Sequence, residues 1–294
     1  MSSRPLPLFI VDAFADRPFT GNPAAVCLLD GQLEDAQWAQ ALAAEMNLSE
    51  TAFVEPEAAD GTRRLRWFTP TVEVSLCGHA TVATAHALAE AGQVVSGSVV
   101  RFATASGEVT AEILPGGSGR IVLDFPARPA TACSADDELL DAFGLAPRWV
   151  GRSEENDVLI EVDRDEWVLA AEPDMHRLAS VNARGVILTA RADPATDLPA
   201  TQDGRRPDFI SRFFAPQSGV PEDPVTGSAH CTLAPHWGRR LGRDELCAYQ
   251  ASRRGGFVEL ELRADRVRLG GGAVTTLTGH LTPASGTSAS HVGS

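Results

Sequence analysis

The chain has 294 residues, of which 44% are hydrophobic and 22% charged, and its formal net charge is −14. This length is enough for about two domains, each with a substantial core. The negative charge disfavours nucleic acid and anionic membranes as partners. No apolar run reaches the ~18 residues that a membrane helix needs. The N-terminus, residues 1–14, is interrupted by proline and aspartate, so it indicates a first strand rather than a signal peptide.

Two features of the composition exclude whole classes of chemistry. All 25 basic residues are arginine, because the sequence contains no lysine. Pyridoxal phosphate enzymes, lysine aldolases and P-loop proteins need that amine and are therefore excluded. The five cysteines are odd in number and form no Cys-x-x-Cys pair, so they indicate neither a disulfide framework nor a structural zinc site. We expect no cofactor, no metal and a reducing, cytoplasmic location.

The order of the predicted elements is typical of an α+β protein. Runs rich in β-branched and aromatic residues and bounded by Gly, Pro or Asp predict the strands. In chain order these are 8–14, 24–29, 51–56, 65–70, 98–104, 120–125, 157–162, 166–171, 185–190, 208–216, 246–252, 256–263 and 265–279. The predicted helices are 33–46, 78–90, 135–144, 174–180 and 227–241.

Two stretches of the chain share an outline. "RWFTPTVEVSLCGHATVATAHAL" begins at Arg66, and "RFFAPQSGVPEDPVTGSAHCTLAPHW" begins at Arg212. The two arginines are 146 positions apart (212 − 66), and the turn glycines Gly78 and Gly227 are 149 apart (227 − 78), whereas half of 294 is 147. This spacing predicts a chain built from two similar halves, which decides the whole fold.

The glycine-rich segment at 114–120 predicts a domain boundary. We expect an N-terminal domain at 1–117, which the C-terminal segment 275–285 completes, and a C-terminal domain at 118–274. The small and polar residues at 286–294 predict a disordered tail.

The helix expected in each half is apolar on nearly all sides. The helix after Gly78 has no formal charge before Glu90, and the helix after Gly227 has none before Arg239, although Pro235 is expected to kink it. Because a surface helix shows one polar face, these two helices should be buried. The sequence thus predicts, in each half, a curved and mostly antiparallel sheet around a central helix.

A buried helix that begins at a glycine turn exposes unpaired amides and a partial positive charge, which favour an anion. Two such starts facing each other would hold a small carboxylate from both sides. The alternative is that Gly78 and Gly227 only allow close packing, while Thr226 or Ser228 caps its helix. The residues alone leave both explanations open.

Ionisable and nucleophilic side chains gather at both turns. They are Cys77 and His79 at the first turn and Asp223, Thr226, Ser228 and His230 at the second. Taken singly, each has a structural explanation, such as a small core residue for the cysteine or a turn former for the aspartate. Their occurrence together at two matching positions favours an acid/base site, since pKa values shift readily at buried helix ends.

These residues also carry a resemblance. The motifs "VDAFADRPFTGNPAAV", "NLSETAFV", "LCGHATVATAHAL", "EDPVTGSAHCTLAPHW" and "GGGAVTTLTG" run in order along almost the whole chain. With them the sequence resembles the phenazine-biosynthesis PhzF-like family, which is related to diaminopimelate epimerase. The resemblance implies two domains of like fold, an active site between them, no cofactor, and a homodimer.

The resemblance also implies roles for individual residues. Glu50 in "NLSET" matches the acid/base carboxylate of the family. The other catalytic positions are matched by His79, Asp223 and Ser228, and the substrate-binding positions by Cys77, Gly78, Thr226 and Gly227. The turn amides would then bind the carboxylate of the substrate.

The leading hypothesis is an isomerase that moves a proton within a small carboxylate-bearing metabolite, such as a ring acid. The related epimerases use a cysteine at each turn, but the corresponding residues here are Cys77 and Thr226. A threonine hydroxyl is a poor acid or base near neutral pH, so Glu50 is the better base. Two alternatives stay open: an amino-acid racemase or epimerase that uses Cys77, and an inactive ligand-binding or interaction protein.

Overall fold

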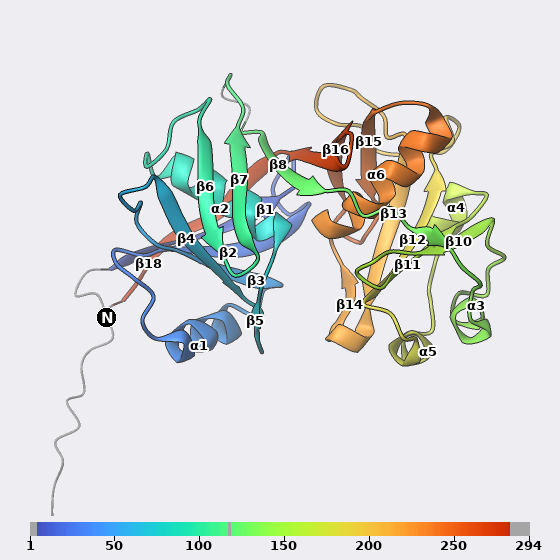
Figure 1. Ribbon diagram of the computed structural model, residues 1–294, viewed down its shortest axis with the longest axis horizontal. Helices are drawn as coiled ribbons and strands as arrows, with labels where there is room; N and C mark the ends of the chain where they lie inside the picture. Colours follow the sequence, from blue (N-terminus) through green and yellow to red (C-terminus); the bar gives the residue numbers. More distant parts are fainter. Residues whose placement is uncertain (1–4, 117–118, 283–294) are drawn as a thin grey trace, which may run out of the picture.

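The computed structural model describes residues 5–116 and 119–282. Figure 1 shows two halves side by side, each with strands curved around one central helix. This arrangement agrees with the α+β architecture predicted from the sequence. The tail predicted at 286–294 lies outside the described residues.

The strands are β1 (Leu6–Ala13), β2 (Asn22–Leu28), β3 (Glu50–Val54), β4 (Thr62–Phe68), β5 (Glu73–Val74), β6 (Val99–Thr104), β7 (Gly107–Ile113), β8 (Ile121–Pro126), β9 (Thr131–Ala132), β10 (Trp149–Arg152), β11 (Asp157–Glu161), β12 (Gly185–Arg191), β13 (Phe209–Ala215), β14 (Val220–Asp223), β15 (Glu245–Gln250), β16 (Gly256–Arg263), β17 (Arg266–Gly271) and β18 (Ala273–Leu281). The helices are α1 (Ala36–Met46), α2 (Gly78–Glu90), α3 (Asp137–Phe143), α4 (Asp165–Leu169), α5 (Met175–Ser180) and α6 (Gly227–Leu241), with a 3₁₀ turn, η1, at Pro216–Ser218.

The pairing of the strands repeats from one half to the other. In the N-terminal half, β2–β3 is parallel, β3–β4 antiparallel, β4–β5 antiparallel, β4–β6 parallel, and β6–β7 and β7–β8 antiparallel. In the C-terminal half, β11–β12, β12–β13, β13–β14, β13–β15, β15–β16 and β16–β17 follow the same order of parallel and antiparallel pairs. The repeat predicted from the spacing of the two motifs is therefore a repeat of the fold.

Two connections join the halves. Strand β8 pairs with β7 on one side and with β17 on the other, so the sheet continues from one half into the next. Strand β18 leaves the C-terminal half and pairs antiparallel with β1, from Ala13 opposite Ala273 to Leu6 opposite Leu281. The chain thus crosses between the halves twice.

The shared Arg-aromatic-Phe motif has the same structural role in both halves. The guanidinium of Arg66 binds both carboxylate oxygens of Glu73 at 2.7 Å, and Arg212 binds Glu222 at 2.6 and 2.9 Å. Each arginine also stacks over the phenylalanine two positions later. A bidentate pair of this kind fixes the short return strand, β5 or β14, against its neighbour. This strand leads directly to the turn before the central helix.

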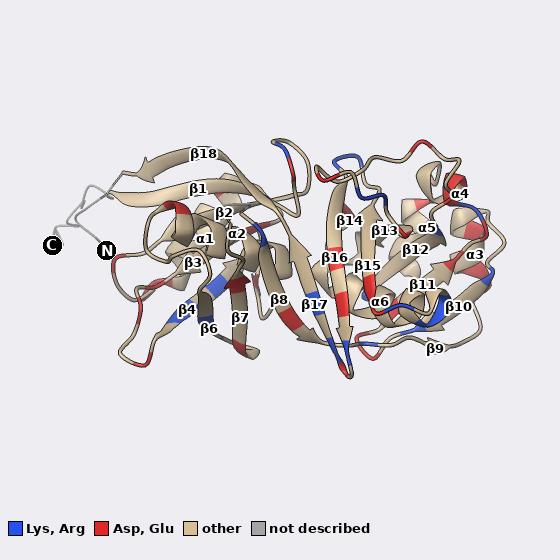
Figure 2. Cartoon of the chain, turned by 90° about the horizontal axis from the view of Figure 1, so that it is seen from above, with Lys and Arg blue, Asp and Glu red and all other residues tan. Residues whose placement is uncertain are grey.

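Charged residues occur along β8, β16 and β17, which lie where the two halves join (Figure 2). On β17, Arg268 contacts Glu112 of β7 and Glu261 of β16, while Arg266 binds Asp124 of β8 at 2.8 Å. Such exposed cross-strand pairs contribute roughly 0.2–1 kcal/mol each. These ion pairs keep the solvent-facing side of the strands polar, while the opposite side packs against the helices.

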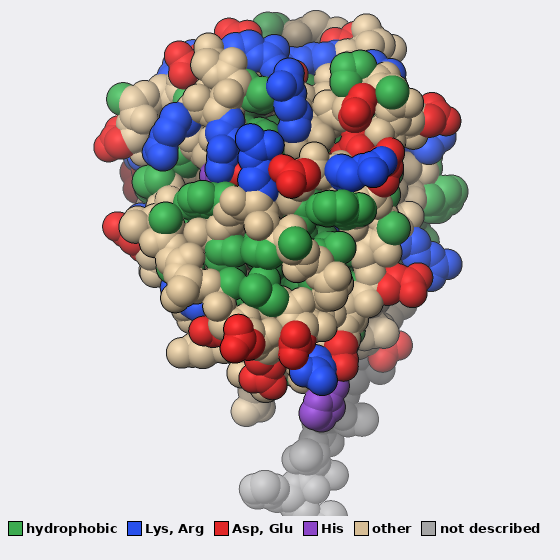
Figure 3. Space-filling view, turned by 90° about the vertical axis from the view of Figure 1, so that its right-hand side faces the viewer, with side chains coloured by type: hydrophobic (Ala, Val, Ile, Leu, Met, Phe, Trp, Pro, Cys, Tyr) green, Lys and Arg blue, Asp and Glu red, His purple; other side chains and the backbone are tan. Residues whose placement is uncertain are grey.

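The central helices are buried, as predicted. Helix α2 contacts β1, β2, β3, β7, β8 and β18, and α6 contacts β15, β16 and β17. One large apolar cluster includes residues of both helices and both sheets, among them Leu88, Leu123, Leu233 and Leu269. Figure 3 shows the end formed by the C-terminal half, where hydrophobic side chains reach the surface in a band between charged groups.

Two details differ from the sequence prediction. Residues 166–171 were predicted as a strand, but α4 occupies Asp165–Leu169, since a short apolar run does not distinguish a helix from a strand. The strand predicted at 265–279 is two strands, β17 and β18, which pair in different halves. Helix α6 has the predicted range, with Pro235 inside it.

Sequence reasoning also missed the short strands β5, β9, β10 and β14 and the longer strand β7. The missed β7 has a clear signal, because buried and exposed residues alternate from Val109 to Ile113. In the part of the chain that the structure describes, no helix is long and apolar enough to cross a membrane.

Candidate active site

The first turns of the two central helices lie against each other. A methyl group added to Gly78 would lie 3.7 Å from the Cα atom of Gly227, and the reverse substitution gives the same distance. The side chains of the residues before the helices, Cys77 and Thr226, accept no hydrogen bond from the helix amides. Capping by Thr226, one of the explanations left open by the sequence, is therefore not what the structure shows. The first-turn amides of α2 and α6 therefore lie close to each other.

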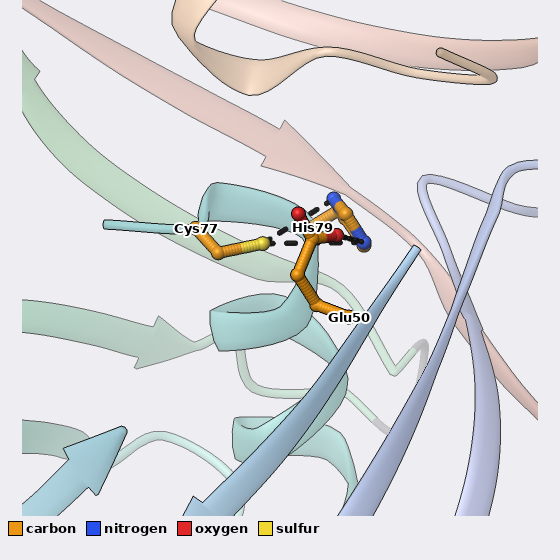
Figure 4. A group of neighbouring side chains, drawn as sticks. All are labelled: Glu50, Cys77 and His79. Carbon is orange, nitrogen blue, oxygen red and sulfur yellow. Dashed lines mark hydrogen bonds and ion pairs between the residues drawn. The ribbon is translucent and has the colours of Figure 1, made fainter. Parts of the chain in front are cut away.

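Three side chains of the N-terminal half converge beside this point (Figure 4). Glu50 is the first residue of β3, and Cys77 and His79 flank the first glycine of α2. Glu50 Oε2 lies 3.1 Å from His79 Nε2, and Cys77 Sγ lies 3.5 Å from His79 Nδ1. Among the described residues, Glu50 Oε2 has no aligned hydrogen-bond partner. That oxygen is buried, and the His79 imidazole is its charged neighbour.

Asn22 connects this group to the C-terminal half. Its amide nitrogen donates to Asp223 Oδ1 at 2.8 Å and to the carbonyl of Val225 at 2.9 Å, and it lies 3.2 Å from His79 Nδ1. Asn22 is fully buried at the start of β2. The side chain therefore holds the turn before α6 against the imidazole at the start of α2.

A second set of hydrogen bonds fixes the turn before α6. Thr226 Oγ1 donates to Asp223 Oδ2 at 2.5 Å, and Gln250 accepts from the Thr226 amide at 2.9 Å. The Gln250 side chain also donates to the carbonyl of Asp223 at 2.8 Å. The Thr226 hydroxyl is thus a hydrogen-bond donor to Asp223 rather than an independent acid or base.

The charges of Glu50 and His79 stabilise each other. Burial alone would raise the pKa of Glu50, but the positive charge of His79 lowers it below the ordinary value of 4.5. Burial alone would lower the pKa of His79, but its contacts with Cys77 and Glu50 raise it well above 6.5. Of these two groups, Glu50 is the one that carries a negative charge at neutral pH. At neutral pH the pair is therefore a carboxylate beside an imidazolium.

The remaining titratable groups of the site are less suited to transfer a proton. Burial and then the nearby Glu50 charge raise the pKa of the Cys77 thiol to about 11, so it stays protonated at neutral pH. Burial raises the pKa of Asp223, although His79 opposes this. Burial lowers the pKa of His230 to about 4, and its Nδ1 lies 2.8 Å from the Thr226 carbonyl. His230 is a neutral residue of the core.

The Glu50, Cys77 and His79 group could also hold a metal ion. One ligand atom from each residue lies within 4.8 Å of the others. Carboxylate, thiolate and imidazole are the ligands of many zinc sites, but a thiol with a raised pKa gives up its proton reluctantly to a metal. The absence of a metal stays a prediction.

Ser228 follows Gly227 at the start of α6 and has partners of its own. Its Oγ accepts a hydrogen bond from Arg184 at 3.1 Å, and Arg184 also forms an ion pair with the buried Asp157. The structure shows a contact between Glu50 and His79, whereas the role of Ser228 in the site stays a prediction.

The repeat explains why the two turns carry unlike residues. The registers of β3–β4 and β12–β13 place Gly185 where the N-terminal half has Glu50. A side chain at Gly185 would collide with the ring of Phe213, whose atoms lie 2.1 Å from the position of an added Cβ. The C-terminal half therefore has no room for a second base at the equivalent position.

Two residues of the site were missed from the sequence, Asn22 and Gln250. Asn22 lies inside the "TGNPAAV" motif that carries the resemblance, so a signal for it was present. Gln250 is the last residue of β15, and only the parallel pairing of β15 with β13 brings it to the turn. No local sequence pattern predicts that Gln250 reaches the site.

The repeated curved sheet around a central helix defines the diaminopimelate epimerase-like fold, and the paired carboxylate and imidazolium equip it for proton transfer. The chain belongs to the phenazine biosynthesis-like protein family, which its sequence matches over residues 11–279. The protein is an isomerase of this family, whose homologues are named as isomerases.

The similar proteins cover nearly the whole chain. An uncharacterized isomerase of Pseudomonas aeruginosa is 48% identical over 280 residues, which are 94% of this chain and 98% of the relative. The human phenazine biosynthesis-like domain-containing protein is 39% identical, with 94% and 99% covered. The crystal structure of an Enterococcus faecalis PhzF family protein has a TM-score of 0.84 at 36% identity, with 95% and 99% covered. A hydroxyproline epimerase from Agrobacterium vitis, at 12% identity and a TM-score of 0.59, shares the fold.

Proposed function

We propose that the protein moves a proton within a small carboxylate-bearing metabolite, at a site between its two halves. The observation that carries this proposal is the contact between Glu50 and His79 beside the paired helix starts. Glu50 takes a proton from one carbon of the substrate and returns it to another. A positioned acid/base group of this kind contributes about 10²–10⁴-fold in rate.

The other residues prepare Glu50 and the substrate. The imidazolium of His79 keeps Glu50 ionised and stabilises negative charge that develops on the substrate. Asp223, held by Asn22 and Thr226, approaches from the C-terminal half. The uncapped first-turn amides at Gly78 and Gly227 are suited to a carboxylate, because two helix N-termini contribute partial positive charge at the same place.

A single base favours isomerisation over racemisation. Racemases that use two acid/base groups place one on each face of the substrate carbon. Here Gly185 occupies the position equivalent to Glu50, and the Cys77 thiol has a pKa of about 11. Glu50 therefore both removes and returns the proton. The racemase alternative requires Cys77 to act, which a Cys77→Ser variant tests directly.

A substrate-independent experiment tests the proposal. The purified protein is incubated in D₂O with a panel of ring acids and amino acids, and mass spectrometry measures deuterium uptake at carbon. Glu50→Gln should reduce uptake by about 10²–10⁴-fold. The exposed Glu45 of α1 provides the matched control, Glu45→Gln, which should keep full exchange.

Two outcomes would change the proposal. Exchange that survives Glu50→Gln but is lost in Cys77→Ser would establish the racemase alternative. Tight binding of a panel member without exchange in the unsubstituted protein would indicate a binding protein. The absence of a cofactor, the homodimer and the cytoplasmic location belong to the same proposal, and light scattering of the purified protein tests the dimer.

A further inference from the structure

A separate cavity of about 250 Å³ lies where loops of both halves meet. The N-terminal half contributes Arg17 and Thr20, from the loop between β1 and β2, and the C-terminal half contributes Tyr249 and Arg254. Glu50, Cys77 and His79 are not among the residues that line it. Its volume is below the ~300–1,000 Å³ of sites for drug-sized molecules, so it suits a smaller ligand.

Charged side chains occur on the walls of the cavity, and they differ in how far they are already paired. Two guanidinium groups, Arg17 and Arg254, line it with one carboxylate, Asp16. Arg254 is paired with the buried Asp12 at 2.7 Å, and Asp16 Oδ2 accepts a hydrogen bond from the amide of Gln202 at 3.3 Å. Among the described residues, the exposed Arg17 guanidinium forms no hydrogen bond and no ion pair, so its charge is available to a ligand.

An apolar wall faces these charges. Tyr249 and Phe257 lie with their ring centroids 5.0 Å apart and both line the cavity. Gly255 lets the Tyr249 ring lie against the backbone, because a Cβ there would be 2.1 Å from the phenol oxygen. The phenol has no hydrogen-bond partner among the described residues, and burial raises its pKa, so it remains a neutral donor.

The cavity touches the connection between the two halves. Arg254 donates to the carbonyls of Gly21 and Thr20 at 2.9 and 3.0 Å and forms an ion pair with the buried Asp12 at 2.7 Å. Gly21 directly precedes Asn22, which holds the two parts of the active site together. A ligand of the cavity would therefore contact the arginine that positions this connection.

We propose that the cavity is an accessory site for a small aromatic carboxylate. The ring packs against Tyr249 and Phe257, and the carboxylate is bound by Arg17 and the phenol of Tyr249. Free hydrogen-bond donors and an apolar wall occur together here, and both are needed to distinguish an aromatic acid from a simple anion. The inference does not depend on the proposed isomerase mechanism, because it uses none of its residues.

Tyr249 is the only tyrosine of the chain, so it provides a specific probe. Protein labelled with 3-fluorotyrosine should give one ¹⁹F resonance, whose shift is followed while benzoate is added at constant ionic strength. Benzamide, which has the same shape without the charge, is the control ligand. We expect a saturable shift with benzoate and about tenfold or more weaker binding of benzamide, the effect of losing one charge-assisted hydrogen bond.

Three variants locate the ligand. Arg17→Gln should weaken benzoate binding about tenfold and should leave folding intact, since the side chain is exposed. Arg253→Gln, which changes an exposed arginine that does not line the cavity, should leave binding unchanged. Glu50→Gln should also leave it unchanged. The proposal is wrong if the shift does not saturate, if benzamide binds as well as benzoate, or if Glu50→Gln abolishes binding, which would place the ligand at the active site instead.

Discussion

The first turns of the two central helices meet at Gly78 and Gly227, where an added methyl group on either residue would lie 3.7 Å from the Cα atom of the other. Because the fold is a repeat, this contact lies where the two equivalent turns face each other. It places the Glu50 and His79 pair of one half beside the Asp223 turn of the other. The size of these two residues therefore affects both stability and the site.

Substitution of Gly78 should show a sharp dependence on size. An alanine Cβ would make only ordinary contacts, at 3.7 Å from Gly227 and 3.9 Å from Phe125. The two γ-carbons of valine would reach further than the alanine Cβ and force the helix starts apart, at a cost of about 1–3 kcal/mol. Urea denaturation of Gly78→Ala and Gly78→Val measures the difference. Equal free energies of unfolding for the two variants would show that the contact is looser than described.

The rate of proton transfer should depend on pH with a maximum between two limits. Glu50 must be ionised to act as a base, so activity falls as pH decreases through its pKa, which lies below 4.5. His79 must be charged to assist, so activity falls as pH increases through its pKa, which lies well above 6.5. A pH profile of kcat/KM, or of deuterium uptake, tests both limits.

The variant His79→Gln separates the two limits. Without the imidazolium, burial is no longer opposed and the pKa of Glu50 should rise, so the acid limit moves to higher pH. The alkaline limit should disappear. An alkaline limit that persists in this variant would have to be assigned to another group. The same linkage applies to stability: the contribution of His79 is fully present below 6.5 and is lost as pH rises through its folded pKa.

The thiols should react with Ellman's reagent at two very different rates. Cys133 is exposed, whereas Cys27, Cys77, Cys231 and Cys247 are buried. Burial raises the pKa of each buried thiol to about 11 or 12, which leaves little thiolate at neutral pH. One thiol per chain should therefore react rapidly, and Cys133→Ser should remove it. Rapid reaction of a second thiol, lost in Cys77→Ser, would show that the active-site thiol is more acidic and more accessible than its burial indicates.

The sequence predicted the central helices better than any other element. The range 78–90 matches α2 and the range 227–241 matches α6. Both follow a glycine turn and are apolar on nearly all sides, so local residues predict where each helix begins and that it is buried. The peripheral segment at 166–171 was wrong because its short apolar run fits either a strand or the helix α4, and only its packing on β12 and β13 decides.

The residues of the site were predictable to different degrees. Cys77 and His79 lie next to a recognisable turn, so the local pattern points to them. The role of Asn22 depends on hydrogen bonds to residues as far as 203 positions away in the chain, and no local pattern specifies these. The hydroxyl of Ser228 accepts from Arg184, 44 positions away in the chain, and no local pattern specifies this contact either. Both sets of contacts depend on how distant segments of the chain pack together, which the local sequence does not specify.

The proposed mechanism requires neither a metal nor an organic cofactor. Glu50, Cys77 and His79 are close enough to bind a metal, so the prediction is a demanding one. Elemental analysis and an absorption spectrum of protein purified without chelator should show no stoichiometric metal and no visible chromophore. One zinc per chain that disappears in Cys77→Ser would show that these side chains act as ligands rather than as an acid/base group.

The two copies of the arginine motif offer a matched pair of stability tests. Arg212 and Glu222 are 13% and 20% exposed, whereas Arg66 and Glu73 are 17% and 38% exposed. Arg212 also donates to the carbonyl of Ala171 at 2.5 Å, so it is fixed by more than its carboxylate partner. Loss of a carboxylate leaves an unpaired guanidinium, and this costs more where water reaches it less.

We therefore expect Glu222→Gln to lower the free energy of unfolding by about 1–3 kcal/mol, and Glu73→Gln to lower it by about 0–1 kcal/mol. Urea denaturation at low and high salt measures both, and the smaller effect should shrink further in high salt because the exposed pair is screened. Glutamine keeps the size and one acceptor of glutamate, so the change reports mainly on charge. A larger effect at Glu73 would mean that the bidentate pair of the N-terminal half, which leads to Cys77 and His79, supports the fold more strongly than its exposure indicates.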